Sequence, residues 1–307
     1  MIVCVGEALI DFLPRRTVDG GDSYQPFVGG SVLNVAVALG RLGAPAGFFC
    51  GLSEDFFGDM IRDALAASKV DFALCPITAR PTTLAFVKLT DGNAEYAFFD
   101  EGSALRMVEE SDLPPMPAAV TAMHFGSIGL TAEPVGSAYE TMMRNESPDR
   151  LVSFDPNVRP SLVKNRVGYL ARIERMVGMA DIVKLSREDL DWLAPGRGFE
   201  DVAEDWMKRG ASLVILTEGP DGARAVGKDR SIFVRSVEVA VADTIGAGDT
   251  FSAAVLARLH ARGWLDKSTL RSLSQDDLTD LLTYAARAAA ITSSRPGADP
   301  PWSHEMA

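Results

Sequence analysis

The sequence predicts an α/β fold in which a mostly parallel sheet lies between layers of helices. Short apolar runs alternate with longer stretches of helical spacing, and most of these runs are nearly continuous in their apolar character. Strands that are covered on both faces have this character, and their alternation with helices is typical of parallel sheets. With 307 residues, of which 47% are hydrophobic, the chain can also bury a substantial core.

The elements follow one another in a regular order from the N-terminus. Residues 1–13 predict a buried strand, and the helical run NVAVALGRLG (34–43) follows and stops at a glycine. The next predicted strand, AGFFCGLS (46–53), completes a βαβ unit. After a break, the alternation of strands and helices resumes with the strands AVTAMHFGSI (119–128), RLVSFDPN (150–157), ADIVKLS (180–186) and SLVILTEG (212–219).

One segment interrupts the alternation. Residues 82–101 are two β-rich runs around TDGN, which predict an antiparallel hairpin turned at Asp91-Gly92. Together with SYQPFVGG (23–30), this hairpin is expected to form a small accessory sheet. A flap over the carboxyl ends of the strands, where ligands bind in such sheets, is the simplest place for it.

Charge and cysteine content exclude several classes of function. The net charge of -12 argues against nucleic acid as a partner, because nucleic-acid binding depends on clustered Lys and Arg. Cys4, Cys50 and Cys75 lie in apolar surroundings and are interpreted as reduced core residues. The apolar opening is short and carries two acids, so we predict neither a signal peptide nor a membrane span, and a cytoplasmic location.

The run DTIGAGDTF (243–251) carries the strongest chemical signal. Gly246, Ala247 and Gly248 allow a turn whose N–H groups converge, and a helix that begins there adds its positive end, which predicts an anion hole. Asp249 would repel a resting phosphate, but it makes sense as a base that takes a proton from an attacking hydroxyl. The alternative is that Asp249 only caps its helix.

A second group of residues is suited to sugar hydroxyls. Asp11 follows the first apolar run, and Gly29, Gly30 and Asn34 lie where a loop enters a helix. A carboxylate and an amide that converge there can bind hydroxyl groups. A turn with an Asn cap explains the same residues equally well.

Two later strand ends also carry polar residues. FDPNVRP (154–160) places Asn157 and Arg159 at a sheet edge, where Arg159 can meet phosphate or sugar oxygens or be an ordinary surface arginine. In KLSRED (184–189), Ser186 precedes acids that can hold magnesium through water, although a helix cap with first-turn acids is the alternative. GARAVGKD (222–229) is near a P-loop signature, but Asp229 stands where a hydroxyl residue is needed, and a hairpin turned at Gly227-Lys228 fits better.

With these pieces in order, the chain resembles the ribokinase-like, or PfkB, family of carbohydrate kinases over nearly its whole length. DTIGAGDTF is the specific match. The other matching motifs occur in the family's order and are GEALIDF (6–12), VGGSVLNVAVALGRLG (28–43), EDFFGD (54–59), FDPNVRP (154–160), LTEGPDG (216–222) and TSSRPGA (292–298). In the second of these, Ser-Val-Leu (31–33) stands where the family usually has small or proline residues.

The resemblance implies a three-layer α/β/α Rossmann-like core in a single domain over 1–307, with a β-sheet lid formed by about 13–28 and 80–105. It also implies ATP with Mg²⁺, a sugar as acceptor, and dimerisation through the lid as in relatives; a monovalent cation such as K⁺ is a further candidate cofactor. The implied sites are the base Asp249 with its anion hole Gly246, Ala247 and Gly248; the sugar site Asp11, Gly29, Gly30 and Asn34, with Arg159 near the phosphate; the nucleotide site Asn157, Ser186, Thr217, Gly219 and Gly222; and Asp189 as a magnesium contact.

The second lid run leads to a prediction about the sugar. Relatives that phosphorylate 2-keto-3-deoxygluconate tend to carry an arginine after the aromatic pair, whereas this chain has Asp100 and Glu101 there. Acids at that place would repel a sugar acid, so we predict a neutral sugar, fructose first. Ribokinase, 2-keto-3-deoxygluconate kinase and nucleoside kinase activities are the alternatives within the fold, and a sugar-sensing binding protein is the alternative outside catalysis.

Overall fold

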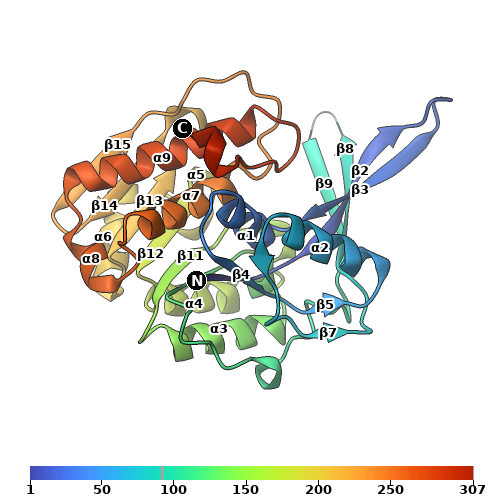
Figure 1. Cartoon of the computed structure of the whole chain (residues 1–307), viewed down its shortest axis with the longest axis horizontal. Helices are drawn as coiled ribbons and strands as arrows, with labels where there is room; N and C mark the ends of the chain where they lie inside the picture. The colour runs from blue at the N-terminus through green and yellow to red at the C-terminus, as the bar shows by residue number, and fades with distance from the viewer. Residues whose placement is uncertain (91–92, 307) are drawn as a thin grey trace.

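The computed structural model describes residues 1–90 and 93–306, and the predicted turn at Asp91-Gly92 lies outside them. Its centre is a nine-stranded sheet (Figure 1). The strands, in sheet order, are β15 (Arg230–Val234), β14 (Ala223–Gly227), β13 (Leu213–Thr217), β12 (Ile182–Ser186), β11 (Leu151–Asp155), β10 (Ala122–Gly126), β1 (Ile2–Val5), β4 (Ala46–Phe49) and β6 (Val70–Asp71).

The sheet is parallel from β13 to β6, and only β14 and β15 run antiparallel to their neighbours. The chain moves outward from β1 to β4 and β6, then returns to β10 on the other side of β1 and continues toward β13. The strand order therefore reverses between β1 and β10. At such a reversal the loops after the two strands separate and leave a crevice in which ligands bind.

Helices cover both faces of this sheet. Because crossovers between parallel strands are right-handed, the reversal after β1 places α3 to α6 on the face opposite to α1. On the α1 face, α1 packs against α7, and α7 packs against α9 (Figure 1). The helices are α1 (Ser31–Arg41), α2 (Phe56–Ala67), α3 (Val135–Glu146), α4 (Arg166–Val177), α5 (Arg187–Leu193), α6 (Phe199–Arg209), α7 (Ala247–Ala261), α8 (Lys267–Ser272) and α9 (Gln275–Ser293), with short 3-10 helices at Glu110–Asp112, Ile128–Thr131, Pro160–Leu162, Gly219–Asp221 and Ser303–Met306.

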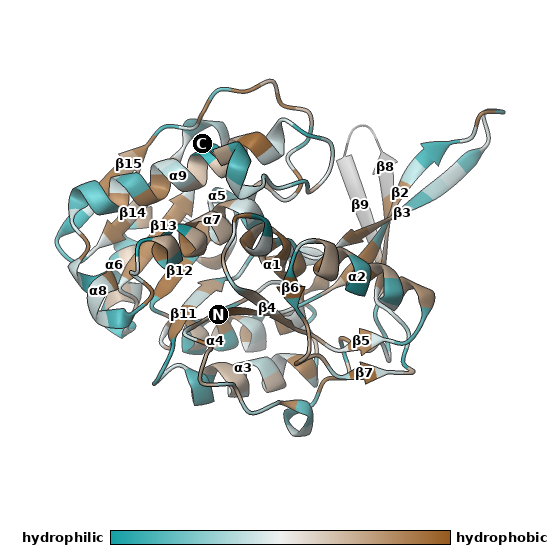
Figure 2. Cartoon of the chain, in the orientation of Figure 1, coloured by the Kyte–Doolittle hydropathy of each residue, from teal (hydrophilic) through white to brown (hydrophobic). Residues whose placement is uncertain are grey.

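The core lies between the sheet and these helices. Figure 2 shows hydrophobic residues along the central strands and hydrophilic ones on the outward parts of α8 and α9. Phe48, Phe49, Phe125 and Phe154 are completely buried. Burial of an aromatic side chain of this size stabilises the fold by about 1.5–3 kcal/mol. The three cysteines are buried and free, as predicted.

A separate four-stranded sheet stands beside the core, in the order β3 (Asp22–Gly29), β2 (Leu9–Arg16), β8 (Leu84–Thr90) and β9 (Asn93–Phe99) (Figure 1). β2 pairs antiparallel with β3 and parallel with β8, and β8 pairs antiparallel with β9. The two β-rich runs of 82–101 and the segment 23–30 thus form the expected accessory sheet. A two-stranded sheet, β5 (Leu52–Ser53) and β7 (Ile77–Thr78), lies nearby.

One predicted element is wrong in an informative way. Residues 1–13 form two strands in different sheets, because β1 ends at Val5 and β2 begins at Leu9. Asp11 therefore lies inside β2 rather than at the end of the first strand. Both segments are apolar and partly or fully covered, so hydrophobic pattern alone does not reveal that the chain changes sheet between them.

Residues 46–53, predicted as one strand, likewise divide between β4 of the central sheet and β5 of the two-stranded sheet. The segment 222–229 belongs to the hairpin of β14 and β15, in which Gly227 pairs with Arg230 around Lys228 and Asp229. It is therefore not a nucleotide-binding P-loop. Within residues 1–90 and 93–306, no helix combines the length and the apolar character that crossing a membrane requires.

Candidate functional site

A cavity of about 1270 Å³ opens at the carboxyl edge of the central sheet, where the strand order reverses. Its walls include Glu7 after β1, Ser127 after β10, and Lys184 and Ser186 at the end of β12. The four-stranded sheet, called the second sheet below, lines one end of the cavity, and residues of α7 and α9 line the other end. The cavity lies where small-molecule sites form in such sheets, and it is larger than most sites for one small molecule.

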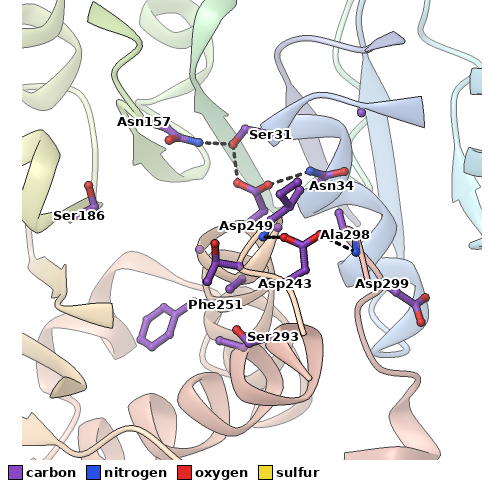
Figure 3. Close-up of a pocket in the computed structure, with 18 of the residues that line it drawn as sticks. Ser31, Asn34, Asn157, Ser186, Asp243, Asp249, Phe251, Ser293, Ala298 and Asp299 are labelled. Atoms are coloured by element: carbon purple, nitrogen blue, oxygen red, sulfur yellow. Dashed lines mark hydrogen bonds between the residues drawn. The ribbon is translucent and has the colours of Figure 1, made fainter. Parts of the chain in front are cut away.

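The start of α7 lies at the middle of this cavity (Figure 3). Gly246 has φ +76°, and a Cβ atom there would lie 2.6 Å from Cβ of Ala298, so both the backbone and the packing require glycine. The first backbone bond of the helix runs from Thr250 N–H to the Gly246 carbonyl. The N–H groups of Gly248 and Asp249 have no partner within the helix, which leaves them available for an anion.

Asp249 lies in the first turn of α7, and its side chain does not cap the helix. Its Oδ1 accepts a hydrogen bond from the Ser31 hydroxyl at 2.6 Å, and its Oδ2 accepts one from Nδ2 of Asn34 at 2.9 Å. Burial raises the pKa of Asp249 above its ordinary value, and the two donors oppose that shift. The carboxylate is thus buried at the cavity wall, beside the free N–H groups of its own helix.

The start of α1 faces the start of α7. Gly30 is the cap of α1, and Oε1 of Glu7 accepts hydrogen bonds from the N–H groups of Ser31 (2.7 Å) and Val32 (3.3 Å). Glu7 is buried, its Oε2 has no partner among the described residues, and burial raises its pKa to about 7. Sequence reasoning missed Glu7, although an acid within the apolar opening of the chain was the available signal.

The predicted sugar residues converge on the end of the cavity next to the second sheet. Asp11, Gly29, Gly30 and Asn34 all line it. A Cβ atom at position 29 would lie only 2.2 Å from Oδ2 of Asp11, so the Asp11 carboxylate occupies the space that a side chain on residue 29 would need. Burial raises the pKa of Asp11 to about 6, although the nearby Arg159 guanidinium lowers it.

Asn157 and Arg159 also line the cavity, from the loop after β11. Nη1 of Arg159 donates to Oδ1 of Asn157 at 2.6 Å and to the Asn157 carbonyl at 3.2 Å. Nδ2 of Asn157 donates to the Ser31 hydroxyl at 2.6 Å. Asn157, which was predicted to contact the nucleotide, is therefore in direct contact with the network around Asp249 (Figure 3).

The other end of the cavity is lined by Thr217, Gly219 and Gly222 and by exposed apolar residues. Val237, Val239, Val241 and Ile245 are the apolar members, with 37–65% of their surface exposed. Apolar walls with a few polar groups are typical of small-molecule sites.

Asp243 joins two of the motifs at this end of the cavity. Its Oδ1 accepts from Ile245 N–H and its Oδ2 from Gly297 N–H, each at 3.0 Å. The motifs DTIGAGDTF and TSSRPGA, which are distant in sequence, therefore form one wall.

The geometry speaks against the predicted magnesium contact of Asp189. Asp189 does not line the cavity, and its carboxylate accepts from Val158 N–H (2.7 Å), Ser186 N–H (2.9 Å) and the Ser186 hydroxyl (2.8 Å). It forms a capping box with Ser186 and fixes the loop that carries Asn157 and Arg159. Ser186 and the exposed Glu188 do line the cavity. No cluster of three or more metal-binding side chains occurs in the described part of the chain.

Lys184 is a second residue that sequence reasoning missed. It is buried on β12, and its Nζ donates to Oδ2 of Asp155 at 2.9 Å. The same Nζ lies 3.3 Å from where a Cβ on Gly248 would be. Burial alone would lower the pKa of Lys184, but Asp155, Asp189 and Asp249 raise it above its ordinary value. A lysine inside a buried apolar strand was the signal, because lysine is rarely buried unless it is paired.

The structure does not support the reason given for a neutral sugar. Asp100 forms an ion pair with Arg106, whose Nη1 lies 3.2 Å from both carboxylate oxygens. Neither Asp100 nor Glu101 lines the cavity. The two acids are therefore not part of the cavity wall, and Arg106 offsets the charge of Asp100.

Comparison with known proteins shows the family to which the chain belongs. A model of the pfkB family of carbohydrate kinases matches residues 1–305. A fructokinase of Rhizobium leguminosarum bv. trifolii is 46% identical over 278 residues, which cover 91% of this chain and 85% of that protein.

Solved structures share the fold. A fructokinase of Xylella fastidiosa with bound ATP has a TM-score of 0.89 at 29% identity, over 97% of this chain and 93% of that one. A double mutant of Vibrio cholerae O395 fructokinase with fructose, ADP and potassium has a TM-score of 0.84 at 26% identity, over 97% and 93%.

The buried pair of Lys184 and Asp155 predicts a large effect on stability. Lys184→Met should lower the free energy of unfolding by about 3–5 kcal/mol, because it leaves the Asp155 carboxylate buried and unpaired. Lys184→Met combined with Asp155→Leu should recover much of that loss. Urea unfolding measures both, with Lys208→Met as the matched control: its ion pair with Glu204 is 65% and 67% exposed, so its loss should change the free energy of unfolding little. A Lys184→Met variant as stable as this control would contradict the prediction.

Proposed function

The chain belongs to the pfkB family of carbohydrate kinases, and on that premise we propose that its cavity transfers the γ-phosphoryl group of ATP to a hydroxyl group of fructose. The observation that carries this proposal is the Asp249 carboxylate beside the free N–H groups at the start of α7. A base and an anion hole on the same turn are what transfer of a charged group to a hydroxyl needs.

The two ends of the cavity suggest where each substrate lies. We place fructose next to the second sheet, where Asp11 and Asn34 can bind hydroxyl groups and Gly29 and Gly30 let the sugar approach the backbone. We place ATP at the other end of the cavity. Its adenine ring lies between the apolar side chains of 237–245, and its phosphates lie near Thr217, Gly219 and Gly222. The γ-phosphate then reaches the start of α7.

The reaction is an in-line displacement in which atoms and charge balance. Asp249 accepts the proton of the sugar hydroxyl, the hydroxyl oxygen bonds to the γ-phosphorus, and the bond from that phosphorus to the β,γ-bridging oxygen breaks to release ADP. The N–H groups of Gly248 and Asp249 stabilise the charge on the transferring group. Lys184 adds a fixed positive charge behind the same turn, and Arg159 adds another from across the cavity.

Magnesium fits this site as a companion of the nucleotide. Mg²⁺ usually keeps several waters and binds through substrate phosphates and one or two carboxylates. Glu188, an exposed carboxylate on the cavity wall, is the residue that we propose to contact such a hydrated ion, in place of Asp189. The ion would neutralise phosphate charge. A bound potassium ion in the Vibrio cholerae relative supports testing K⁺ as well.

The second sheet is proposed to act as a lid over the sugar. Asp11, Phe27, Val87 and Phe98 from its strands line the cavity, so movement of this sheet would admit the sugar and then exclude water. Exclusion of water matters because water is the competing acceptor. Dimerisation through this sheet and a cytoplasmic location stay predictions from the sequence.

The base is tested by Asp249→Asn. This change keeps the shape and one of the two accepting oxygens but removes the proton acceptor, so kcat should fall by about 10²-fold or more while ATP affinity changes little. Steady-state ADP production and a separate ATP-binding titration measure the two effects. Asp276→Asn, in the exposed first turn of α9, is the matched control and should behave as wild type. Near-normal turnover by Asp249→Asn would refute the role of the base.

The identity of the sugar is tested by a substrate panel with purified protein, Mg²⁺ and ATP. Fructose should give the highest kcat/KM, and ribose, adenosine and 2-keto-3-deoxygluconate should each be at least about tenfold lower. ADP release is measured with and without each compound. Faster turnover of 2-keto-3-deoxygluconate than of every neutral sugar would contradict the proposal, and ADP release that no sugar stimulates would favour a binding protein.

A further inference from the structure

Ser31 occupies a special place in the network around Asp249. It is the first residue of α1, and its N–H donates to Oε1 of Glu7 at 2.7 Å. This contact fixes the start of the helix against the end of β1. The Ser31 hydroxyl consequently lies between the loop after β11 and the carboxylate on α7, and it touches both (Figure 3).

The hydrogen bonds through Ser31 have only one consistent direction. Arg159 has donors only, so its contact with Asn157 must be to the amide oxygen, Oδ1. The amide nitrogen of Asn157 then faces Ser31 and can only donate, so the Ser31 oxygen accepts there, at 2.6 Å. The single hydroxyl hydrogen of Ser31 remains for Oδ1 of Asp249, also at 2.6 Å.

We propose that Ser31 is a positioning residue that aims the Asp249 carboxylate and keeps it ready to accept a proton, at the end of a directed chain from Arg159 through Asn157. The inference rests on the proposed kinase function. Asn34 holds the other oxygen, so the two donors from α1 fix the plane of the carboxylate. Arg159 and the base are thereby linked through two intervening side chains, although they lie on different elements.

The surroundings of Asp249 make the Ser31 donor matter for the charge of the carboxylate. Burial raises the pKa of Asp249, the hydrogen bonds from Ser31 and Asn34 lower it, Asp155 on β11 raises it and Lys184 on β12 lowers it. Glu7, after β1, is the remaining nearby acid, and α9 contributes Ala286, Ala289 and Ala290 to the cavity wall. Loss of the Ser31 hydroxyl leaves the effect of burial less opposed, so the pKa of Asp249 rises further.

The sign of the expected effect follows from this shift. A base with a raised pKa is protonated, and so inactive, up to a higher pH. Removal of the Ser31 hydroxyl should therefore move the acidic limb of the activity profile upward, while activity well above that limb is largely kept. A residue that only supports the fold would lower activity by a similar factor at every pH.

The experiment compares wild type, Ser31→Ala and Ser31→Thr in kcat and kcat/KM for fructose, with saturating ATP and Mg²⁺, across pH 5–9. For Ser31→Ala we expect the acidic limb to rise by about one pH unit and the alkaline plateau to stay within a few-fold of wild type. Ser31→Thr retains the hydroxyl and should restore the limb. Ser68→Ala removes another buried hydroxyl, which contacts Arg41 outside the cavity, and should leave the profile unchanged.

The outcomes separate this inference from the proposed function. If wild type turns over fructose and Ser31→Ala keeps its acidic limb in place, the role of Ser31 is overturned and the kinase function stands. If Ser31→Thr fails to restore the limb although both variants show the wild-type thermal unfolding midpoint, the role of the hydroxyl is also overturned. If wild type itself shows no sugar-dependent ADP release, the function and the inference fall together.

Discussion

The burial of the Asp249 carboxylate at the first turn of α7 is the constraint on which the rest of the site depends. A buried charge is costly unless it is paired and hydrogen-bonded. Here Ser31 and Asn34 donate to its two oxygens, and Lys184 lies close enough to favour its charged form. Each of these residues comes from a different segment from Asp249, so the buried carboxylate has its hydrogen-bond donors and its nearby positive charge only when α1, β12 and α7 are all in place.

The sheet topology brings those segments together. Because the strand order reverses between β1 and β10, the loops at their carboxyl ends diverge, and the start of α1 enters the gap beside the start of α7. The second sheet grows out of the same region, since β2 follows β1 after a short connection and carries Asp11 to the opposite wall. A single reversal in strand order thus creates the cavity whose two ends we propose to bind the sugar and ATP.

Much of this arrangement could be predicted from the sequence, and the failures have physical causes. The motif DTIGAGDTF predicted both the glycine turn and the acid beside it, because glycines followed directly by an apolar helix are compatible with few other local structures. The roles of Lys184 and Glu7 were not predicted, because they depend on partners far away in sequence. Lys184 pairs with Asp155, and Glu7 accepts from the backbone of α1. The prediction for Asp100 failed for the same reason. Its position in the chain suggested a substrate contact, whereas in the structure it pairs with Arg106 and does not line the cavity.

The central claim is that the acceptor hydroxyl meets residue 249 while the γ-phosphate meets the start of α7. A crystal structure of the Asp249→Asn variant with fructose and a non-hydrolysable ATP analogue tests it most directly. We predict one fructose hydroxyl oxygen about 3 Å from the side chain at position 249, and a γ-phosphate oxygen at a similar distance from the N–H of Gly248. Fructose bound with every hydroxyl more than about 6 Å from that side chain, beyond reach through a single water, would contradict the account.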